Sequence, residues 1–552
     1  MEDGIMITIV MLVFITMVIA AIIVSKIAKK NRLEKDVLNA FDKAPDSKRD
    51  NEMESISEYY RYVDIDNLNA DDITWNDLDM DEVFERVNTC ESSVGEEYLY
   101  ALLHRQLTSE EEADFKHLLD LLEKDEKLRY ETCKSLHNLG IFNYNSVAKS
   151  CLRGAEGFEY IGSPKLYMVL VFLPIAAGIL GFLFASGTGA LVGAIAGCIC
   201  NMAVYYKTSV KIEHHLGMMK YLCRILFCAQ KLGKVSNDSY YTEFNELYKP
   251  FASAAKLLSQ IGKEASADVL ADIVEGYAKL ITLRDLNTYA YLRELIGDKK
   301  EEINRVYKHI GFLDAVCAVL NFRGSSEVWC VPEFTEKREM TFNGLVHPLI
   351  ENPVANDFDI TGNILVTGSN ASGKSSFVKA AAINAILAQS ILTCTAEQFR
   401  LRRCKVVTSM AVRDDICAGD SYFVAEIKSM KRIVEQVRTE YCFCVIDEIL
   451  KGTNTIERIA ASVSVLKEMA ETESICVAAT HDIELTVMLE DCYRNVHFEE
   501  TVTDDDVTFD YKIKEGAART RNAIKLLKVN GFPEAVISAA EQLAEKLSEE
   551  RR

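Results

Sequence analysis

The run Gly368-Ser-Asn-Ala-Ser-Gly-Lys-Ser375 has the residue types and spacing of a phosphate-binding loop. In such a loop, backbone N–H groups and a helix N-terminus surround the β-phosphate, and two glycines permit the tight curl. Lys374 would reach the β- and γ-phosphates, and the Ser375 hydroxyl would bind Mg²⁺. The pattern therefore predicts a site for ATP or GTP with Mg²⁺. The predicted nucleotide-binding residues are Gly368, Ser369, Asn370, Ala371, Ser372, Gly373, Lys374, Ser375 and Ser376.

Two carboxylates end a second apolar run, Tyr441-Cys-Phe-Cys-Val-Ile-Asp447-Glu448, which is typical of a buried parallel strand. Asp447 would hold the Mg²⁺ shell, and Glu448 would orient or deprotonate an attacking water. A third apolar run, Ile475-Cys-Val-Ala-Ala-Thr480, ends at His481, which could sense the γ-phosphate. A lone histidine at a strand tip is more often structural. Its place behind two nucleotide motifs favours a catalytic role.

Regular elements must hold these side chains in position. Residues 364–367 form an apolar strand directly before the loop, and the small-residue stretch 376–392 predicts a helix directly after it. This strand, loop and helix context argues against a chance match in a Gly/Ser segment. The buried strands that carry the motifs predict an α/β fold for this part of the chain.

Four segments in this order resemble the ATPase domain of the MutS family, a branch of the ABC-type ATPases. The phosphate loop with the residue after it, 368–376, is similar to that family's G-P-N-M-x-G-K-S-T. The other three segments resemble D-D-L-x-x-G-x-S-T-F-x-x-E, D-E-I-G-R-G-T-S-T and A-T-H-x-x-E-L, and they are residues 414–426, 447–455 and 479–485. Landmarks at His347-Pro348, Asn356-Asp357 and Gly531-Phe-Pro533 agree with the family in order. The resemblance covers residues 326–540 and implies an α/β P-loop (ABC-type) ATPase domain.

The resemblance also implies a shared site in a homodimer. Two ATPase domains of that family pack head to tail, so Ser421 of one subunit would contact the γ-phosphate bound by the other. ATP with Mg²⁺ would act as a clamp between subunits, and hydrolysis would release it. The implied catalytic residues are Glu448, His481, Lys374 and Ser421, with Ser375 and Asp447 as the metal ligands.

The sequence departs from the family pattern at several places. Ser369 and Ala371 replace the usual Pro and Met, which are packing choices. Asp420 stands where the family often has Arg, and a carboxylate beside the γ-phosphate would oppose binding unless it points away. Pro353 lies roughly where an aromatic residue often stacks on adenine, which predicts a different recognition of the base.

Composition restricts the partners of this 552-residue chain. A net charge of −21 argues against a broad nucleic-acid surface, because binding to the phosphate backbone needs Lys and Arg. It leaves room for a local basic patch, so nucleic acid stays an open but unsupported partner. The 16 cysteines include no CxxC pair, which favours buried free thiols in a reducing cytosol over metal sites or disulfides.

Two apolar blocks predict three transmembrane helices. Residues 5–24 are long enough to span a bilayer, and the lysines that follow place the N-terminus outside. A cleaved signal peptide is the weaker alternative, because no positive region precedes this segment. The block 167–206 suits two spans broken at Ser186-Gly-Thr-Gly189, with a buried soluble hairpin as the alternative. The topology predicts a multi-pass protein, of a bacterial plasma membrane, with the ATPase domain in the cytoplasm.

The chain therefore divides into six predicted regions. They are an N-terminal anchor (1–27), an acidic helical region resembling the start of the MutS core (28–160), a transmembrane hairpin (161–210), an all-α core or lever region (211–325), the ATPase domain (326–516) and a C-terminal helical dimerisation segment (517–552). For residues 33–160 a plain acidic amphipathic linker is the alternative. The sequence shows no mismatch-reading domain at its N-terminal end and no room for a nuclease domain after residue 540.

Four functions remain open at this stage. The leading hypothesis is a membrane-anchored MutS-like ATPase that switches a homodimer and acts on an unknown protein partner. The second is a membrane-tethered DNA-binding protein of mismatch repair or recombination. The third is a transport-related ABC-type ATPase, disfavoured because Asn201 is the only polar residue lining the spans. A nucleotide-locked scaffold would carry the same motifs as the first.

Overall fold

The structure is a computed structural model that describes residues 34–45, 53–63, 67–142, 146–254, 281–369, 372–410, 422–451, 453–502, 507–518 and 531–550, with a few positions between 16 and 32. The chain forms two compact units. Unit 1 comprises residues 1–64, 88–101 and 114–321, and unit 2 comprises residues 65–87, 102–113 and 322–552.

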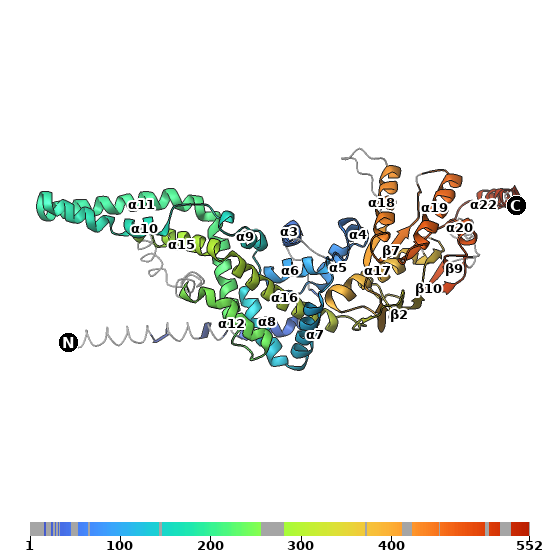
Figure 1. The fold of residues 1–552 in the computed structure, drawn as a ribbon, viewed down its shortest axis with the longest axis horizontal. Coiled ribbons are helices and arrows are strands. Elements are labelled where there is room, and N and C mark those ends of the chain that lie inside the picture. Colours follow the sequence, from blue (N-terminus) through green and yellow to red (C-terminus); the bar gives the residue numbers. More distant parts are fainter. Residues whose placement is uncertain are drawn as a thin grey trace. The chain divides into compact units, whose positions relative to one another are not determined.

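A mixed six-stranded sheet forms the centre of unit 2, with strand order β10-β9-β4-β8-β7-β6 (Figure 1). Only the edge strand β10 runs antiparallel to its neighbour. Strands β4, β7 and β8 are almost entirely buried, which explains their continuous apolar sequences. The strands are β4 (Ile364–Thr367), β6 (Lys405–Ser409), β7 (Cys442–Asp447), β8 (Ile475–Ala479), β9 (Arg494–Val502) and β10 (Val507–Glu515).

Helices cover both faces of this sheet. On one face, α18 (Tyr422–Val437) and α19 (Thr455–Ala470) pack in a single apolar cluster with alternate residues of β7 and β8. Helix α17 (Lys374–Ile391) contacts β6, β7 and β8 from the other face and is buried along most of its length. Its small residues permit this close packing. Two further helices of the unit are α20 (Ile483–Met488) and α22 (Glu534–Glu550).

A second sheet of four strands, in the order β1-β5-β2-β3, covers the outer side of α17. Phe342 of β2 packs on Phe377 of α17 with 5.9 Å between ring centroids, and it stacks on Phe399 of β5 at 6.0 Å. The helix that follows the phosphate loop is therefore held between two sheets. The strands are β1 (Glu333–Phe334), β2 (Met340–Leu345), β3 (Asn356–Ile360) and β5 (Gln398–Leu401).

Two N-terminal helices, α4 (Asp72–Asp77) and α5 (Met80–Val87), belong to unit 2. The Asp77 carboxylate accepts hydrogen bonds from the Thr408 hydroxyl at 2.7 Å and the Met410 backbone N–H at 2.9 Å. These contacts close the free edge of β6. These helices lie within the predicted region 28–160, and no local sequence pattern marks hydrogen bonds that span more than 300 positions.

Unit 1 is helical, and buried carboxylates tie its helices together. Glu97 accepts hydrogen bonds at 2.7 Å from the backbone N–H groups of Val147 and Ala148 and from the Tyr307 hydroxyl. Asp314 accepts from the backbone N–H groups at Glu91 and Ser92. The helices are α2 (Met53–Ile56), α3 (Glu58–Tyr62), α6 (Ser93–Leu103), α7 (Ser109–Lys124), α8 (Glu126–Leu139), α9 (Val147–Arg153), η1 (Gly154–Gly157), α10 (Pro164–Val171), α11 (Leu173–Leu232), α12 (Ser239–Tyr248), η2 (Lys249–Ala254), α15 (Arg284–Asp298) and α16 (Lys300–Gly324), of which α6, α7 and α16 continue into unit 2.

The apolar block in unit 1 is a helical hairpin. Helix α11 reverses at Ala185 and Ser186, whose backbone angles are not helical, and its two limbs run side by side (Figure 1). A Cβ on Gly181 would lie 2.0 Å from the carbonyl oxygen of Gly189 across the hairpin. Glycine is therefore required at this close approach of two backbones.

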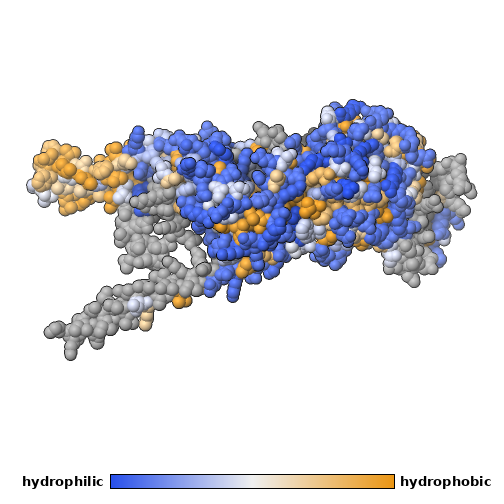
Figure 2. All heavy atoms as spheres, turned by 60° about the horizontal axis from the view of Figure 1, so that its bottom comes forward, coloured by the Kyte–Doolittle hydropathy of each residue, from blue (hydrophilic) through white to orange (hydrophobic). Residues whose placement is uncertain are grey.

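Where three membrane-spanning helices were predicted, the described residues contain one helix, Pro164–Glu213, that is long and apolar enough to cross a membrane by length and composition. The backbone is not helical at Ala185 and Ser186, so this segment consists of two limbs that fold back on each other. Its most apolar window is only 6% buried, and Figure 2 shows apolar side chains covering this hairpin. The predicted span 5–24 lies almost wholly outside the described residues.

Asn201, the one polar side chain predicted to line the spans, has a structural partner. Pro174 has no N–H, so the carbonyl of Leu170 loses its helical donor. The Asn201 Nδ2 atom replaces that donor at 3.0 Å and also bonds the Ile281 carbonyl at 2.9 Å. Asn201 is fully buried and repairs a break in the helix.

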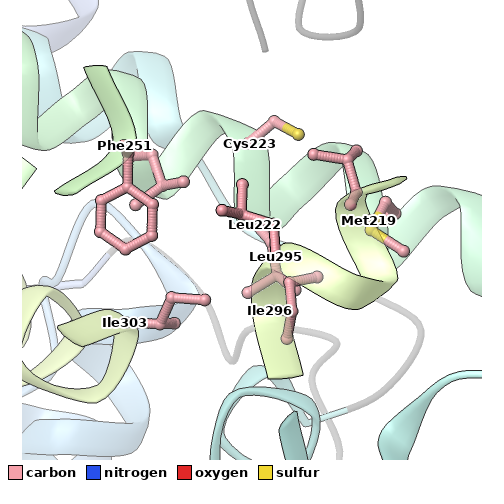
Figure 3. Close-up of a pocket in the computed structure, with 9 residues that line it drawn as sticks. Met219, Leu222, Cys223, Phe251, Leu295, Ile296 and Ile303 are labelled. Carbon is pink, nitrogen blue, oxygen red and sulfur yellow. The ribbon is translucent and has the colours of Figure 1, made fainter. Parts of the chain in front are cut away.

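An apolar cavity in unit 1 is lined by residues of α11, η2, α15 and α16 (Figure 3). Met219 and Leu222 face Leu295 and Ile296 across it. Its volume is about 10 Å³, which is roughly the room for one water molecule. The cavity is a packing gap of the core.

Candidate functional site

The phosphate loop connects β4 to α17. Both of its glycines have positive φ angles, 139° at Gly368 and 99° at Gly373, a region that other residues rarely adopt. A Cβ on Gly368 would also lie 2.7 Å from the carbonyl oxygen of Phe498 on β9. Backbone conformation and close packing therefore both require glycine here.

Lys374 is buried at the start of α17, with 1% of its surface exposed. Its ammonium donates to the carbonyl oxygens of Gly368 at 2.5 Å and Ser369 at 2.9 Å, so it closes the loop from inside. Burial lowers the pKa of Lys374 to about 8, while the nearby carboxylates of Asp447 and Glu500 oppose that shift. A buried ammonium inside a loop of this shape is suited to phosphate oxygens.

Ser375 and Asp447 meet at the carboxyl end of β7. The Ser375 hydroxyl donates to the Asp447 carboxylate at 2.7 Å, across 72 positions of sequence. Mg²⁺ prefers oxygen ligands and is usually held by one or two protein groups together with phosphates and waters. This pair fits that requirement. Among the described residues, no group of three or more His, Cys, Asp or Glu side chains could hold a metal by itself.

Glu448 follows β7 with a left-handed backbone, φ 55°, which is uncommon for a residue other than glycine. Its N–H donates to the carbonyl of Ala479 at 2.9 Å. The Glu448 carboxylate lies between Lys451 and His481. It forms an ion pair with Lys451, and one of its oxygens is 3.1 Å from Nε2 of His481. An unusual backbone that the neighbouring strand fixes is typical of a functional position.

His481 follows β8 and reaches both motifs. Its Nε2 lies 3.4 Å from the Lys374 ammonium, in addition to its contact with Glu448. Burial lowers the pKa of His481, and the charge of Lys374 lowers it further. The imidazole is therefore neutral near pH 7 and can exchange donor and acceptor roles beside the carboxylate.

Some of the remaining predicted residues lie in the described part of the chain and others do not. Ser372 is buried and donates to the Ser369 carbonyl at 2.7 Å, and Ser376 is exposed on the first turn of α17. From the predicted 414–426 segment, Glu426 accepts a hydrogen bond from the backbone N–H of Lys451 at 3.0 Å. The predicted residues Asn370, Ala371, Asp420 and Ser421 lie outside the described part of the chain.

Two side chains at the loop were not identified from the sequence. Glu500 on β9 accepts a hydrogen bond from the Ser369 hydroxyl. Tyr511 lies in an irregularity of β10 with φ 54°, and a Cβ on Gly373 would be 3.0 Å from its ring. Asn356 holds this bulge, donating to the Tyr511 carbonyl and accepting from the Ile513 N–H, both at 3.0 Å. The aromatic ring beside the loop thus comes from β10.

Residues 364–548 match the protein-family model described as MutS domain V. The DNA mismatch repair protein MutS of Synechococcus sp. (strain CC9902) is 27% identical over 279 residues, which are 48% of this chain and 31% of that protein. That of Trichormus variabilis is 24% identical over 338 residues, 57% of this chain and 39% of that protein. The DNA mismatch repair protein msh3 of Aspergillus niger is 29% identical over 276 residues, 47% of this chain and 24% of that protein.

The chain thus spans about a third of the length of the two MutS proteins. These similarities relate residues 364–548 to MutS domain V and about half of the chain to part of the MutS proteins.

Proposed function

We propose that this chain is a membrane-anchored MutS-like ATPase in which ATP binding and hydrolysis switch a homodimer between conformations. The observation that carries the ATPase proposal is the convergence of three strand ends on one loop. Lys374, the Ser375–Asp447 pair and the Glu448–His481 pair come from β4, β7 and β8 and meet within hydrogen-bonding distance. This arrangement supplies a phosphate cation, a metal site and a base in one place.

The residues divide the work of hydrolysis between them. Ser375 and Asp447 would hold Mg²⁺, which would supply positive charge to offset that of the phosphates. Lys374 would direct its ammonium at the β- and γ-phosphates, where it stabilises the charge that develops on the transferred group.

Glu448 would hold the attacking water and accept its proton. Lys451 and His481 orient its carboxylate from two sides, and the fixed backbone keeps it at the end of β7. Because His481 is neutral near pH 7, it can donate to the γ-phosphate or the water without neutralising Glu448 as a base. Tyr511 would form one wall for the nucleotide base, since its ring lies beside Gly373 and is 43% exposed.

The family resemblance supports the homodimer, and the exposed apolar hairpin supports the membrane anchor. Ser421 would complete the γ-phosphate site of the second subunit, as the family resemblance implies. Each limb of the hairpin has about 20 residues, which at about 1.5 Å per residue spans the roughly 30 Å of a bilayer core. The exposure of its apolar surface supports insertion in lipid, with the turn at Ser186 outside and the ATPase domain in the cytoplasm.

A role on DNA is the second candidate function. The names of the similar proteins favour it, and the net charge of −21 opposes broad contact with phosphate backbones. A transport role has less support, because Asn201 is occupied with backbone carbonyls of its own unit.

Phosphate release by the full chain in detergent or native membranes tests the proposal. We expect Mg²⁺-dependent hydrolysis of ATP that Lys374→Ala abolishes, and recovery of the protein in the membrane fraction after carbonate washing. Equal rates in both proteins would refute the site. Stimulation of severalfold or more by duplex, branched or mismatched DNA at moderate salt would favour the second function.

A further inference from the structure

Glu500 is a third carboxylate at the nucleotide site, beside Asp447 and Glu448. It lies near the end of β9, which pairs in parallel with β4 so that His497 is beside Thr367. The carboxyl end of β9 therefore extends along the phosphate loop. There Glu500 is only 9% exposed and accepts a hydrogen bond from Ser369, the second residue of the loop.

Ser369 holds this carboxylate against the loop. The family pattern has Pro at this position, and Pro carries no hydroxyl to donate. The Ser369–Glu500 contact is therefore a departure of this chain from the pattern that it resembles. The charge of Glu500 also acts on Lys374, the cation of the loop, so it acts on the space that the phosphates would occupy.

The described side chains at the site do not balance this charge. The cations are Lys374 and Lys451, and the carboxylates are Asp447, Glu448 and Glu500. The negative charge of Asp447 would bind Mg²⁺, and Glu448 would act as the general base. Neither role is assigned to Glu500, and its negative charge repels every phosphate that enters the loop. At an effective dielectric constant of about 20, one unit charge about 8 Å away changes affinity by roughly tenfold or more per unit of ligand charge.

We propose that Glu500 sets the nucleotide affinity of this site and makes it selective for nucleotide already complexed with Mg²⁺. Free ADP and ATP carry two more negative charges than their Mg²⁺ complexes, so the same carboxylate repels them more strongly. The proposal rests on the nucleotide site proposed above and adds its specificity-determining residue. It concerns affinity and charge preference, because Glu500 accepts a hydrogen bond from the loop residue Ser369.

Glu499 provides a matched control on the same strand. Successive side chains of a strand point to opposite faces, and Glu499 pairs with Lys514 at 3.1 Å with 42% of its side chain exposed. Glu499→Gln and Glu500→Gln remove the same charge from adjacent positions. Only the second removes it from the phosphate loop.

Calorimetric or fluorescence titration of the full chain with ADP, with excess Mg²⁺ and with EDTA, tests the proposal. For Glu500→Gln we expect roughly tenfold tighter binding of ADP with Mg²⁺, and roughly 100-fold or more tighter binding in EDTA, where ADP carries two more negative charges. Glu499→Gln stays within twofold of the unmodified chain in both buffers. Ser369→Ala keeps the charge but releases it from the loop, so it tightens binding in EDTA by less than Glu500→Gln does. Glu500→Ser gives the same direction if glutamine is not tolerated.

The outcomes separate this inference from the proposed function. If Glu500→Gln binds ADP no more tightly than Glu499→Gln in EDTA, or more weakly, the inference is overturned and the nucleotide site stands. If Lys374→Ala binds ADP as well as the unmodified chain, the nucleotide site itself is refuted and the inference falls with it.

Discussion

Glu448→Gln should separate ATP binding from ATP hydrolysis. Glutamine keeps the size of the side chain and can still bond His481, which lies 3.1 Å from the carboxylate. It removes the negative charge and the proton acceptor. We therefore expect ATP affinity to stay the same or rise, because one charge that repels the γ-phosphate is lost, while hydrolysis slows.

The size of the rate loss follows from the role assigned to Glu448. A positioned general base contributes about 10²–10⁴-fold to a rate, and each tenfold corresponds to about 1.4 kcal/mol. The expected increase of the activation barrier is therefore about 3–5 kcal/mol. Folding should change little, because the substitution is isosteric and the N–H of residue 448 still bonds the Ala479 carbonyl.

Single-turnover phosphate release, measured together with ATP affinity, tests this expectation. Glu468→Gln is a suitable control, since it removes the same charge from an exposed pair with Arg438 on the surface of unit 2. The variant at position 448 should hold ATP without releasing phosphate and should accumulate as an ATP-bound dimer. A rate within threefold of the control would refute the role of Glu448.

Four further predictions concern other parts of the chain. Asp447→Ala should leave hydrolysis below about 1% of the original rate, since Ser375 alone then remains to bind Mg²⁺. It should also remove the effect of Mg²⁺ on ADP affinity, and an unchanged Mg²⁺ dependence would contradict the role of the Ser375–Asp447 pair. Tyr511→Ala should weaken ADP binding by about 1–3 kcal/mol and should weaken the binding of inorganic phosphate less, because only ADP has a base that can stack on the ring. Titration of both proteins with both ligands measures this, and equal effects on the two ligands would argue against stacking of the base on Tyr511. Burial raises the pKa of Glu97 to about 8 from an ordinary value of 4.5, so its protonated form favours the folded state and that stability is lost as the pH rises from about 4.5 through 8. Urea unfolding at pH 5.5 and 8.0 should therefore show a fall of a few kcal/mol, which Glu97→Gln reduces. Gly181→Leu should force the hairpin limbs apart and lower recovery in the membrane fraction, whereas the same change at Gly187, which has open space around it, should not.

The motifs predictable from the sequence are those whose residues are close together in the chain. The phosphate loop, the Asp447–Glu448 pair and His481 each follow an apolar strand, and parallel strands bring such ends to one edge of a sheet. Their spacing therefore predicted both the α/β fold of unit 2 and the side chains that meet there.

Features that depend on distant strands could not be predicted. Glu500 and Tyr511 reach the loop because β9 pairs with β4 and because β10 bulges at Tyr511, and neither pairing leaves a sequence pattern. The helices α4 and α5 close the edge of β6 through Asp77, far along the chain. The hairpin was predicted from its apolar length, whereas its close packing depends on glycines such as Gly181 and on the repair of the Pro174 break by Asn201.

Binding of ATP to the full chain in the presence of Mg²⁺ tests the central claim most directly. Isothermal titration of the unmodified protein should show one ATP per chain, with affinity that falls when Mg²⁺ is removed. Lys374→Ala should lose binding by at least 100-fold, because the buried ammonium is the cation aimed into the loop. No binding by the unmodified chain, or equal binding by the variant, would contradict the account of this site.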